Sequence, residues 1–261
     1  MTSELGADLA LAHRLADAAR AVTMPRFRGT FTSRRKNDGS LVTEVDEAAE
    51  DAIRAIVARE RPRDAFLGEE RGETGSGSRR WIVDAIDGTL DFAAGATGWG
   101  TLVALEIDGH IAVGICEMSP LGKRYWATRG GGAYVSEGAR DARLHVSGTA
   151  DLAAARCFVP PALWVRTDAA RAMSSAVRAA TLPYEQDEHP ALEIASGSAD
   201  LCVFFTAGPW DLAAPSLVVE EAGGRFTDLA GGRSLTGGAV FSNGPLHEAA
   251  IEVLRQASAA R

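Results

Sequence analysis

One segment, residues 81–92 with the sequence WIVDAIDGTLDF, constrains the fold more than any other part of the chain. Its first three residues are apolar and typical of a buried strand. Asp84 and Asp87 follow within four positions, and Gly88 and Thr89 come directly after them. A carboxylate at the end of a core strand costs free energy unless its charge is compensated. The segment therefore raises the question of what lies between the two aspartates.

The overall charge excludes some classes of partner. The chain has 261 residues, enough for one large or two medium domains, and a net charge of −8. This charge argues against a protein that binds nucleic-acid polymers or anionic membranes, because those surfaces attract basic proteins. An acidic protein can still act on phosphate esters when bound metal ions reverse the sign of the charge locally.

The cysteines and the N-terminus indicate the compartment. Cys116, Cys157 and Cys202 are odd in number and form no paired motif, so we expect neither a disulfide framework nor a structural zinc site. The N-terminal segment has acidic residues early and no uninterrupted apolar run, which argues against a signal peptide. No segment is long enough to span a membrane. We therefore expect a cytoplasmic protein.

The first half of the chain combines helical patterns with hairpin patterns. Apolar residues at helical spacing predict a helix over residues 4–22. Two pairs of apolar runs, with turns at Asp108-Gly109 and at the glycines 130–132, predict hairpins. The other elements expected here are a polar loop or hairpin over 27–46 with its turn at 37–40, a helix from Thr43 to near Pro62, a short strand over 65–70 and a flexible loop over 71–78.

The pattern changes after about residue 147. Helical periodicity around 168–180, 190–197, 212–222 and 246–257 alternates there with apolar runs at 156–159, 201–205 and 239–242. This alternation predicts a second α/β layer. We therefore divide the chain into an N-terminal half, residues 1–147, and a C-terminal half, residues 148–261. The halves are expected to share an interface, where sites are common.

Several acids follow apolar runs and form a candidate metal site. Glu69 and Glu70 follow a short strand, and Asp211 opens a predicted helix. Hard oxygen ligands on rigid elements suit Mg²⁺. Asp84 and Asp87 cannot project from one face of a regular strand, so the chain is expected to turn between them and to present the carbonyl of Ala85 or Ile86 as a further ligand. Such a set can bridge two ions ~4 Å apart, as in two-metal phosphoryl-transfer enzymes.

Gly88 and Thr89 provide a candidate phosphate site. If a helix begins here, its first N–H groups are free and its dipole is positive at this end. The absence of a side chain at Gly88 lets an anion approach the backbone closely. Thr89 can also present its hydroxyl to a metal-bound water.

Each of these residues also has a structural explanation. Asp84 and Asp87 fit turn or N-cap residues. Thr43 and Asp46 fit a capping box, in which the acid closes a helix. Glu69 and Glu70 fit a solvated loop edge, and Asp211 fits another N-cap. The complete set favours the metal site over these separate explanations.

Four segments together resemble the inositol monophosphatase family of metal-dependent, lithium-sensitive phosphomonoesterases. The two family signatures resemble residues 81–92 and 210–224 (WDLAAPSLVVEEAGG), and FLGEE and KNDGSLVTEVD match two further family segments. The resemblance covers nearly the whole chain in order. It implies an α/β fold (α+β layered), an αβαβα five-layer sandwich of the sugar-phosphatase type, and a homodimer.

The resemblance assigns roles to individual residues. The family's water-activating pair resembles Asp46 and Thr89, and its phosphate-binding amides match Gly88 and Thr89. Lys36 and Asp38 lie in the mobile loop that approaches a third metal in the family. These matches imply two or three Mg²⁺ ions beside a bound phosphate, with inhibition by Li⁺. The family's metal ligands fall on Glu69, Asp84, the carbonyl of Ile86, Asp87 and Asp211.

Three positions depart from the family pattern. Ala85 replaces the proline usual between the first two motif acids, which removes no ligand. The small-residue stretch that commonly lines the inositol pocket is replaced by EQDEHPAL, residues 185–192. The family's substrate-binding acid aligns with Phe204. The phosphate chemistry is therefore expected to be intact and the pocket for the alcohol changed.

Within the family, the segment RYWATRGGGAY and the second signature resemble bacterial histidinol-phosphate phosphatases most. That branch often carries an acid where Asp187 falls. Glu185, Asp187 and Glu188 suit a substrate with an amine, and Phe204 can face a planar group such as imidazole. Alternatively, this stretch is a solvated turn before a helix and Phe204 is a core residue.

The leading functional hypothesis is a Mg²⁺-dependent phosphomonoesterase that hydrolyses a small polar phosphate ester. Histidinol phosphate and inositol monophosphate are the favoured substrates. A nucleotide 3′-phosphate or fructose bisphosphate is an alternative. A second hypothesis is a non-catalytic family member that binds a phosphorylated ligand, which loss of any metal-site acid would favour.

Overall fold

The computed structural model describes residues 2–138, 140–161 and 164–259. The helices are α1 (Thr2–Thr23), α2 (Glu44–Glu60), α3 (Thr89–Ala94), α4 (Asp168–Ala180), α5 (Pro190–Ala195), α6 (Pro209–Glu221) and α7 (His247–Ala259). The strands are β1 (Ser33–Arg35), β2 (Leu41–Thr43), β3 (Ala65–Gly68), β4 (Gly72–Thr74), β5 (Arg79–Asp87), β6 (Gly100–Ile107), β7 (His110–Met118), β8 (Lys123–Thr128), β9 (Gly132–Glu137), β10 (Arg140–Arg143), β11 (Arg156–Phe158), β12 (Leu182–Pro183), β13 (Leu201–Ala207), β14 (Arg225–Asp228) and β15 (Gly237–Ser242).

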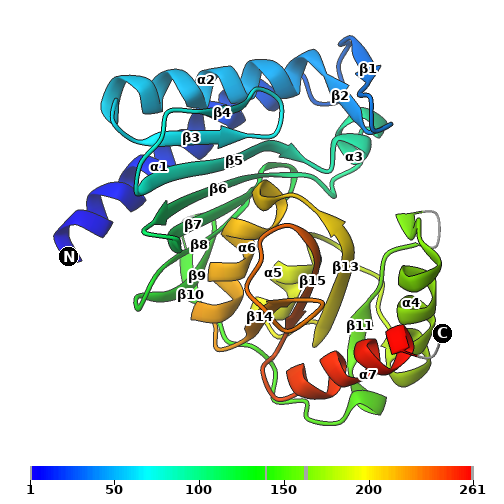
Figure 1. Ribbon diagram of the computed structural model, residues 1–261. Helices are drawn as coiled ribbons and strands as arrows, with labels where there is room; N and C mark the ends of the chain where they lie inside the picture. Colours follow the sequence, from blue (N-terminus) through cyan, green and yellow to red (C-terminus); the bar gives the residue numbers. More distant parts are fainter. Residues whose placement is uncertain (1, 139, 162–163, 260–261) are drawn as a thin grey trace.

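One outer helical layer consists of α1 and α2, which cover one face of an eight-stranded sheet (Figure 1). The strand order is β10-β9-β8-β7-β6-β5-β3-β4, and only β3 and β5 pair in parallel. Leu11 and Leu15 of α1 and Ile53 of α2 pack against Trp81 and Val103 of the sheet. Burying each such side chain contributes about 1.5–3 kcal/mol to the free energy of folding. Because the apolar residues of α1 recur at helical spacing, they lie on one face, and this face packs on the sheet.

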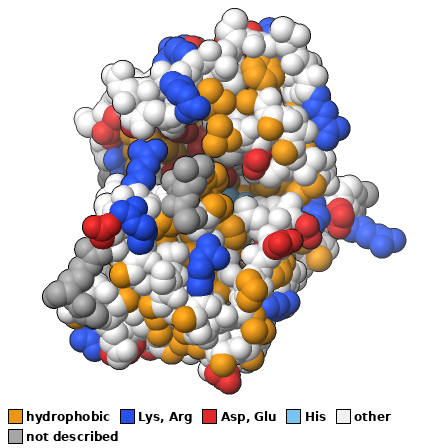
Figure 2. All heavy atoms as spheres, turned by 90° about the vertical axis from the view of Figure 1, so that its right-hand side faces the viewer, with side chains coloured by type: hydrophobic (Ala, Val, Ile, Leu, Met, Phe, Trp, Pro, Cys, Tyr) orange, Lys and Arg blue, Asp and Glu red, His pale blue; other side chains and the backbone are white. Residues whose placement is uncertain are grey.

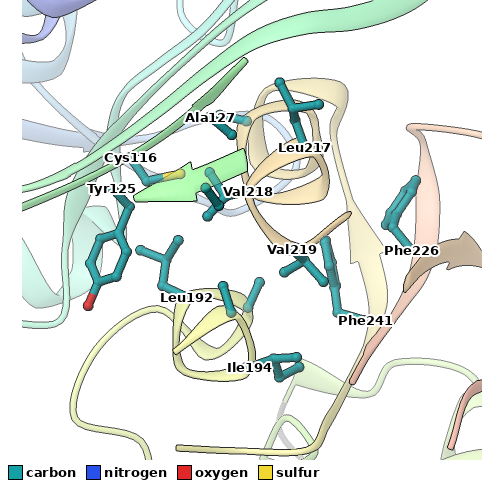
Figure 3. Packing of buried hydrophobic residues seen from close by; sticks show 14 of the residues in the cluster. Cys116, Tyr125, Ala127, Leu192, Ile194, Leu217, Val218, Val219, Phe226 and Phe241 are labelled. Carbon is teal, nitrogen blue, oxygen red and sulfur yellow. The ribbon is translucent and has the colours of Figure 1, made fainter. Parts of the chain in front are cut away.

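The middle layer consists of α5 and α6, which lie between this sheet and a second sheet (Figure 3). Val218 and Val219 of α6 belong to one apolar cluster with Cys116 of β7 and with Phe226 and Phe241 of the second sheet. A helix that is apolar on all sides is stable only when it is buried on all sides. The composition of α6 therefore places it between two sheets.

The second sheet has five strands in the order β12-β11-β13-β15-β14. Strand β11 runs parallel to β12 and β13, whereas β15 is antiparallel to its neighbours β13 and β14. Val177 of α4 and Leu254 of α7 pack against Leu201 and Val240 on its outer face. The layers therefore alternate as helices, sheet, helices, sheet, helices, and the predicted αβαβα sandwich is confirmed.

Most of the local predictions are confirmed. The β6–β7 hairpin turns at Asp108 and Gly109, with φ values of 51° and 77°, and the second predicted hairpin is β8–β9. The flexible loop over 71–78 is wrong in part, because β4 forms there and pairs with β3. This strand has three residues, none of them buried, at the edge of the sheet, so it carries no apolar signal.

The sheets divide the chain between Arg143 and Arg156, where β10 ends and β11 begins. The predicted boundary at residue 147 lies in this interval. Helix α6, from the second half of the chain, packs on both sheets, so the division into two halves stays a prediction. Across the described ranges, none of the helices combines the length and the apolar character needed to cross a bilayer.

Candidate active site

The end of β5 is an irregular strand, which differs from the turn expected between the two aspartates. Asp84 pairs with Leu102 and Asp87 pairs with Gly100, so one extra residue is inserted on the β5 side. This insertion is a β-bulge, a feature that re-aims side chains at strand ends. The chain thus brings Asp84 and Asp87 to one site without leaving the sheet.

The bulge also distinguishes the two backbone carbonyls between the aspartates. The Ala85 carbonyl accepts a hydrogen bond from the buried Thr101 hydroxyl, at 2.8 Å. The Ile86 carbonyl accepts one from the Thr89 hydroxyl, at 3.2 Å, and therefore lies on the side of the acidic residues. The Ile86 carbonyl is the better candidate for a ligand.

Asp84, Asp87 and Asp211 form an acidic centre. One carboxylate oxygen from each residue lies within 4.8 Å of the others. Burial, and then repulsion from Glu69, raises the pKa of Asp84 well above its ordinary value. Burial and repulsion from Asp211 do the same to the pKa of Asp87. Three oxygen donors of like charge at this separation fit a divalent cation, which would remove the repulsion.

Asp211 both closes a helix and joins the acidic centre. It is the third residue of α6, and its Oδ2 accepts a hydrogen bond from the N–H of Gly208, at 2.6 Å. Burial raises its pKa to about 7, although this hydrogen bond acts in the opposite direction. The capping role expected for Asp211 is therefore present at the third helical position and does not exclude a metal-binding role.

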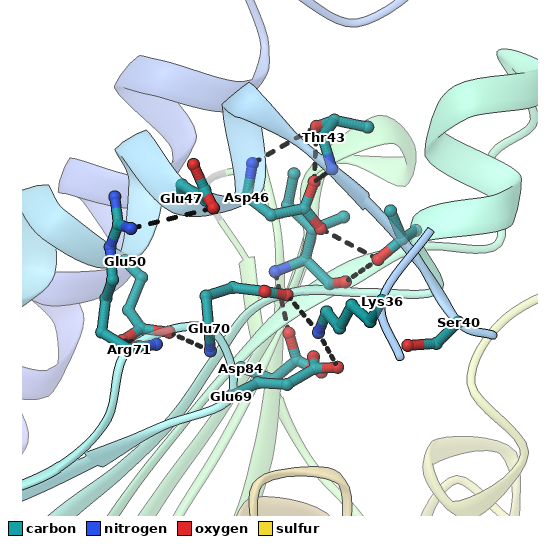
Figure 4. Close-up of polar contacts among 12 residues, drawn as sticks. Lys36, Ser40, Thr43, Asp46, Glu47, Glu50, Glu69, Glu70, Arg71 and Asp84 are labelled. Carbon is teal, nitrogen blue, oxygen red and sulfur yellow. Dashed lines mark hydrogen bonds and ion pairs between the residues drawn. The ribbon is translucent and has the colours of Figure 1, made fainter. Parts of the chain in front are cut away.

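Glu69 and Glu70 lie at the end of β3, where Lys36 connects them (Figure 4). Lys36 Nζ lies 2.7 Å from Oε1 of Glu69 and 2.7 Å from Oε1 of Glu70. Burial raises the pKa of Glu70 to about 7. The ammonium group of Lys36 thus neutralises part of the negative charge beside the acidic centre.

Glu50 of α2 supports this end of β3, a role that the sequence did not indicate. Its carboxylate is fully buried and accepts hydrogen bonds from the backbone N–H groups of Glu70, at 2.7 Å, and Arg71, at 3.1 Å (Figure 4). Arg54, one helical turn later, pairs with the same carboxylate at 2.7 Å. A Cβ atom on Gly68 would lie 2.2 Å from Glu50 Oε1, so the close approach requires glycine.

Asp46 uses its two oxygens for different purposes. Oδ2 accepts hydrogen bonds from the hydroxyl and the N–H of Thr43, which completes the predicted capping box of α2. Oδ1 accepts a hydrogen bond from the Thr89 hydroxyl, at 2.9 Å. Burial raises the pKa of Asp46. The helix-closing explanation is therefore correct, and it leaves the second oxygen directed at Thr89.

Gly88 precedes the six-residue helix α3, which begins at Thr89. Gly88 has φ 83°, in the left-handed region that favours glycine. A Cβ atom there would lie 2.8 Å from the carbonyl oxygen of Gly98. The predicted start of a helix at this point is confirmed, and the Gly88 carbonyl accepts hydrogen bonds from the N–H groups of Asp91 and Phe92.

The β1–β2 hairpin carries Lys36 and Asp38 and turns at the predicted residues. The N–H and the hydroxyl of Ser40 donate hydrogen bonds to Asp38 Oδ1, at 2.9 and 2.7 Å, so this carboxylate stabilises its own turn. The face that carries the hairpin and α3 is hollowed, with acidic side chains visible inside the hollow and Lys and Arg side chains around it (Figure 2).

The residues predicted for the alcohol pocket differ in exposure. Glu185 and Asp187 are exposed, and Phe204 is half-buried. The Phe204 ring lies 6.3 Å from the ring of Phe158 and 6.1 Å from that of His189, measured between centroids. Their role in substrate binding stays a prediction, as does the alternative of a solvated turn beside a core aromatic residue.

His189 is a further residue of this region to which the sequence analysis gave no role. Its Nε2 lies 3.8 Å from Oδ2 of Asp87. Burial lowers the pKa of His189 to about 4, which keeps the imidazole neutral. The sequence feature that could have indicated a role was the position of His189 directly before Pro190, at the start of a predicted helix. A residue in that position has a restricted backbone conformation.

Comparisons with known proteins identify the family of this chain. The model of the inositol monophosphatase family matches residues 6–259. The chain is 39% identical to a histidinol-phosphatase of Streptomyces coelicolor, over 95% of this chain and 97% of that protein. It is 40% identical to a histidinol-phosphatase of Mycobacterium tuberculosis, over 97% and 98%. The crystal structure of the extragenic suppressor protein suhB from Bartonella henselae superposes with a TM-score of 0.85, at 26% identity over 96% and 99% of the two chains.

These matches span nearly the whole chain, and the structural match agrees with its layered fold. The chain belongs to the inositol monophosphatase family and is a phosphatase.

Proposed function

We propose that this phosphatase is a Mg²⁺-dependent phosphomonoesterase and that Asp84, Asp87 and Asp211 hold the metal with help from Glu69 and the Ile86 carbonyl. The observation that carries the proposal is the convergence of three carboxylates within 4.8 Å. All the proposed ligand atoms are oxygens, and oxygen ligands favour Mg²⁺ over softer metals.

The residues around the acidic centre suit the attack of a water on a phosphate ester. Bound Mg²⁺ supplies Lewis-acid stabilisation of charge on the phosphoryl group. Thr89 orients the attacking water through its hydroxyl, and Asp46, 2.9 Å from that hydroxyl, accepts the proton. The N–H groups of Gly88 and Thr89 bind a phosphate oxygen. Lys36, on the loop with Asp38, offsets part of the negative charge of Glu69 beside the acidic centre.

Histidinol phosphate is the proposed substrate, with inositol monophosphate as the second candidate. Two relatives of 39% and 40% identity carry the name histidinol-phosphatase. Glu185 and Asp187 are exposed acids that suit the ammonium group of histidinol, and the half-buried Phe204 suits its imidazole. The nucleotide 3′-phosphate, fructose bisphosphate and non-catalytic alternatives are not favoured, because the two histidinol-phosphatases reported above are more similar to this chain than the relative named for fructose-1,6-bisphosphatase, at 28% identity.

The deciding experiment compares kcat/KM for histidinol phosphate, inositol 1-phosphate and glycerol 2-phosphate, with and without Mg²⁺. We expect hydrolysis only with Mg²⁺ and a preference for histidinol phosphate. A charge-assisted hydrogen bond contributes about 1.5–3 kcal/mol, so Asp187→Asn should lower kcat/KM for histidinol phosphate about ten- to a hundred-fold and spare glycerol 2-phosphate. Glu248→Gln, which removes an exposed carboxylate on the outer helix α7, is the control.

Two results would contradict this proposal at different levels. A preference for inositol 1-phosphate, or an equal effect of Asp187→Asn on all three esters, removes the proposed alcohol pocket. Hydrolysis that is independent of metal, or absent for every ester, removes the proposed catalytic function itself.

Three further properties belong to the same proposal. We expect a homodimer, testable by light scattering, and inhibition of hydrolysis by Li⁺, because both follow from the family resemblance. We expect a cytoplasmic protein that binds neither membranes nor nucleic-acid polymers, which fits its net charge of −8. Co-sedimentation with anionic vesicles would contradict that expectation.

A further inference from the structure

His189 is a buried histidine directed at the acidic centre. It is 8% exposed, and its Nε2 lies 3.8 Å from Asp87 Oδ2. Within residues 2–138, 140–161 and 164–259, the Asp87 carboxylate makes no other ion pair or side-chain hydrogen bond. Asp46, Asp84 and Asp211, in contrast, each have a carboxylate oxygen that accepts a hydrogen bond.

The hydrogen bond on the other side of the ring fixes the position of its proton. Nδ1 of His189 accepts a hydrogen bond from the N–H of Ala191, at 3.2 Å. A ring nitrogen that accepts carries no hydrogen, so the proton of the neutral imidazole is on Nε2. The Nε2–H group therefore faces Asp87.

The ring is also held in orientation by its surroundings. His189 is the N-cap of α5 and precedes Pro190, with extended backbone at φ −60° and ψ 125°. Phe204 packs beside the imidazole at an interplanar angle of 41° and a centroid distance of 6.1 Å. The residue is thus fixed on three sides, and only Nε2 is directed at the acidic centre.

We propose that His189 is a positioning residue, whose Nε2–H orients the Asp87 carboxylate so that its other oxygen faces Asp84 and Asp211. The separation of 3.8 Å exceeds a direct hydrogen bond, so the proposed role requires the Asp87 carboxylate to move toward Nε2 when the metal binds. Mutation of a group that holds a metal-binding carboxylate in this way typically lowers metal affinity or activity by about 10–100-fold. The inference rests on the proposed metal site.

Two substitutions separate this role from helix capping. His189→Asn retains an acceptor near the position of Nδ1 and remains a good N-cap, but its side chain is too short to reach Asp87. His189→Gln places an amide N–H near the position of Nε2 and loses the capping geometry. Thr167→Ala removes a comparable cap from α4 in the outer layer and serves as the control, because its hydroxyl accepts the N–H of Ala170 at 3.1 Å.

The measurements are Mg²⁺ affinity by calorimetry, the thermal midpoint of the metal-free protein, and kcat and KM at saturating Mg²⁺. We expect His189→Asn to keep its thermal midpoint and to bind Mg²⁺ about tenfold or more weakly. His189→Gln should lose stability but recover most of the affinity. Thr167→Ala should lose stability alone.

An unchanged Mg²⁺ affinity in His189→Asn would overturn the inference. A fall in Mg²⁺ affinity in both His189 variants that is proportional to their fall in thermal midpoint would also overturn it. If the wild-type protein itself neither binds Mg²⁺ nor hydrolyses phosphate esters, the proposed function fails. If the wild type does both and the two variants match it, only the role of His189 fails.

Discussion

The hydroxyl of Thr89 lies 2.9 Å from Oδ1 of Asp46, although 43 positions separate the two residues in the chain. The other oxygen of Asp46 is engaged by Thr43 at the start of α2. Since α2 begins there and α3 begins at Thr89, the pair joins the N-termini of two helices beside the acidic centre. The capping bonds fix Asp46, and the fixed Asp46 orients Thr89.

This pair predicts a strong effect of Thr89→Ala on turnover and a small effect on metal binding. The substitution removes the hydroxyl but keeps the backbone N–H. Positioned proton transfer contributes ~10²–10⁴-fold to rate, so kcat should fall by about that factor while Mg²⁺ affinity changes little. Thr89→Ser, which keeps the hydroxyl, should restore most of kcat. Unchanged turnover in Thr89→Ala would leave Thr89 as a helix-start residue.

Asp87→Asn should change activity and stability in opposite directions. Burial and the neighbouring carboxylates raise the pKa of Asp87 well above its ordinary value, so the charged form is unfavourable without metal. The neutral amide should raise the thermal midpoint of the metal-free protein, by about 2–4 °C per kcal/mol for a chain of this size. The same change should abolish hydrolysis. Near-normal kcat at saturating Mg²⁺ would contradict the site assignment.

Gly68→Ala should be destabilising although the residue is small. A Cβ atom at this position would lie 2.2 Å from Glu50 Oε1 and 2.3 Å from its Cδ. Overpacking of this kind costs about 1–3 kcal/mol. The displaced Glu50 would also release the N–H groups of Glu70 and Arg71, which should weaken Mg²⁺ binding. Urea unfolding and calorimetry measure the two effects.

Gly6→Ala is the matched control for that substitution. Gly6 lies in α1, and a Cβ atom there would have no neighbour within 4 Å. Alanine in a helix is favoured over glycine by about 0.5–1 kcal/mol, so this variant should be slightly more stable. Equal stability of Gly68→Ala and the wild type would contradict the role given to Glu50.

The acidic centre predicts that Mg²⁺ affinity depends on pH. Burial raises the pKa of Asp211 from 3.8 to about 7, so between these values the folded protein binds more protons than the unfolded chain. Unfolding free energy of the metal-free protein should therefore fall as pH rises from about 4 to about 7. Mg²⁺ requires the deprotonated form, so its affinity should rise over the same range. Deprotonation of Asp84 and Asp87, whose pKa values are also raised, should extend this rise to higher pH.

Calorimetry in two buffers of different ionisation enthalpy measures this linkage. Proton release on Mg²⁺ binding should be larger at about pH 6 than at about pH 8.5, because Asp211 is mostly protonated at the lower value. Mg²⁺ affinity that does not change between these two pH values would contradict the raised pKa of Asp211.

The layered fold was predicted from the family resemblance, and the local elements were predicted from signals along the chain. The apolar periodicity of α1 and the Asp108-Gly109 turn each act locally, and both are confirmed. The three-residue strand β4 was missed because an exposed edge strand needs no apolar side chains. Pairing with β3, a contact between segments, decides its conformation.

The candidate site was predictable only as a set of residue types. Asp84 and Asp87 stood out because acids rarely follow a core strand, but the bulge that joins them depends on pairing with β6. Glu50 and His189 could not be identified in the same way. Their importance comes from burial against Glu70 and from proximity to Asp87, and neither relationship is visible along the chain.

The end of β5 and the start of α6 together form the proposed metal site, and a crystal structure with Mn²⁺ in place of Mg²⁺ tests this directly. Anomalous difference density identifies the ion independently of activity. We expect a peak coordinated by Asp84, Asp87 and Asp211, with a further ligand from Glu69 or the Ile86 carbonyl. Density only at other acids, or no peak at saturating Mn²⁺, would show that these residues do not form the metal site.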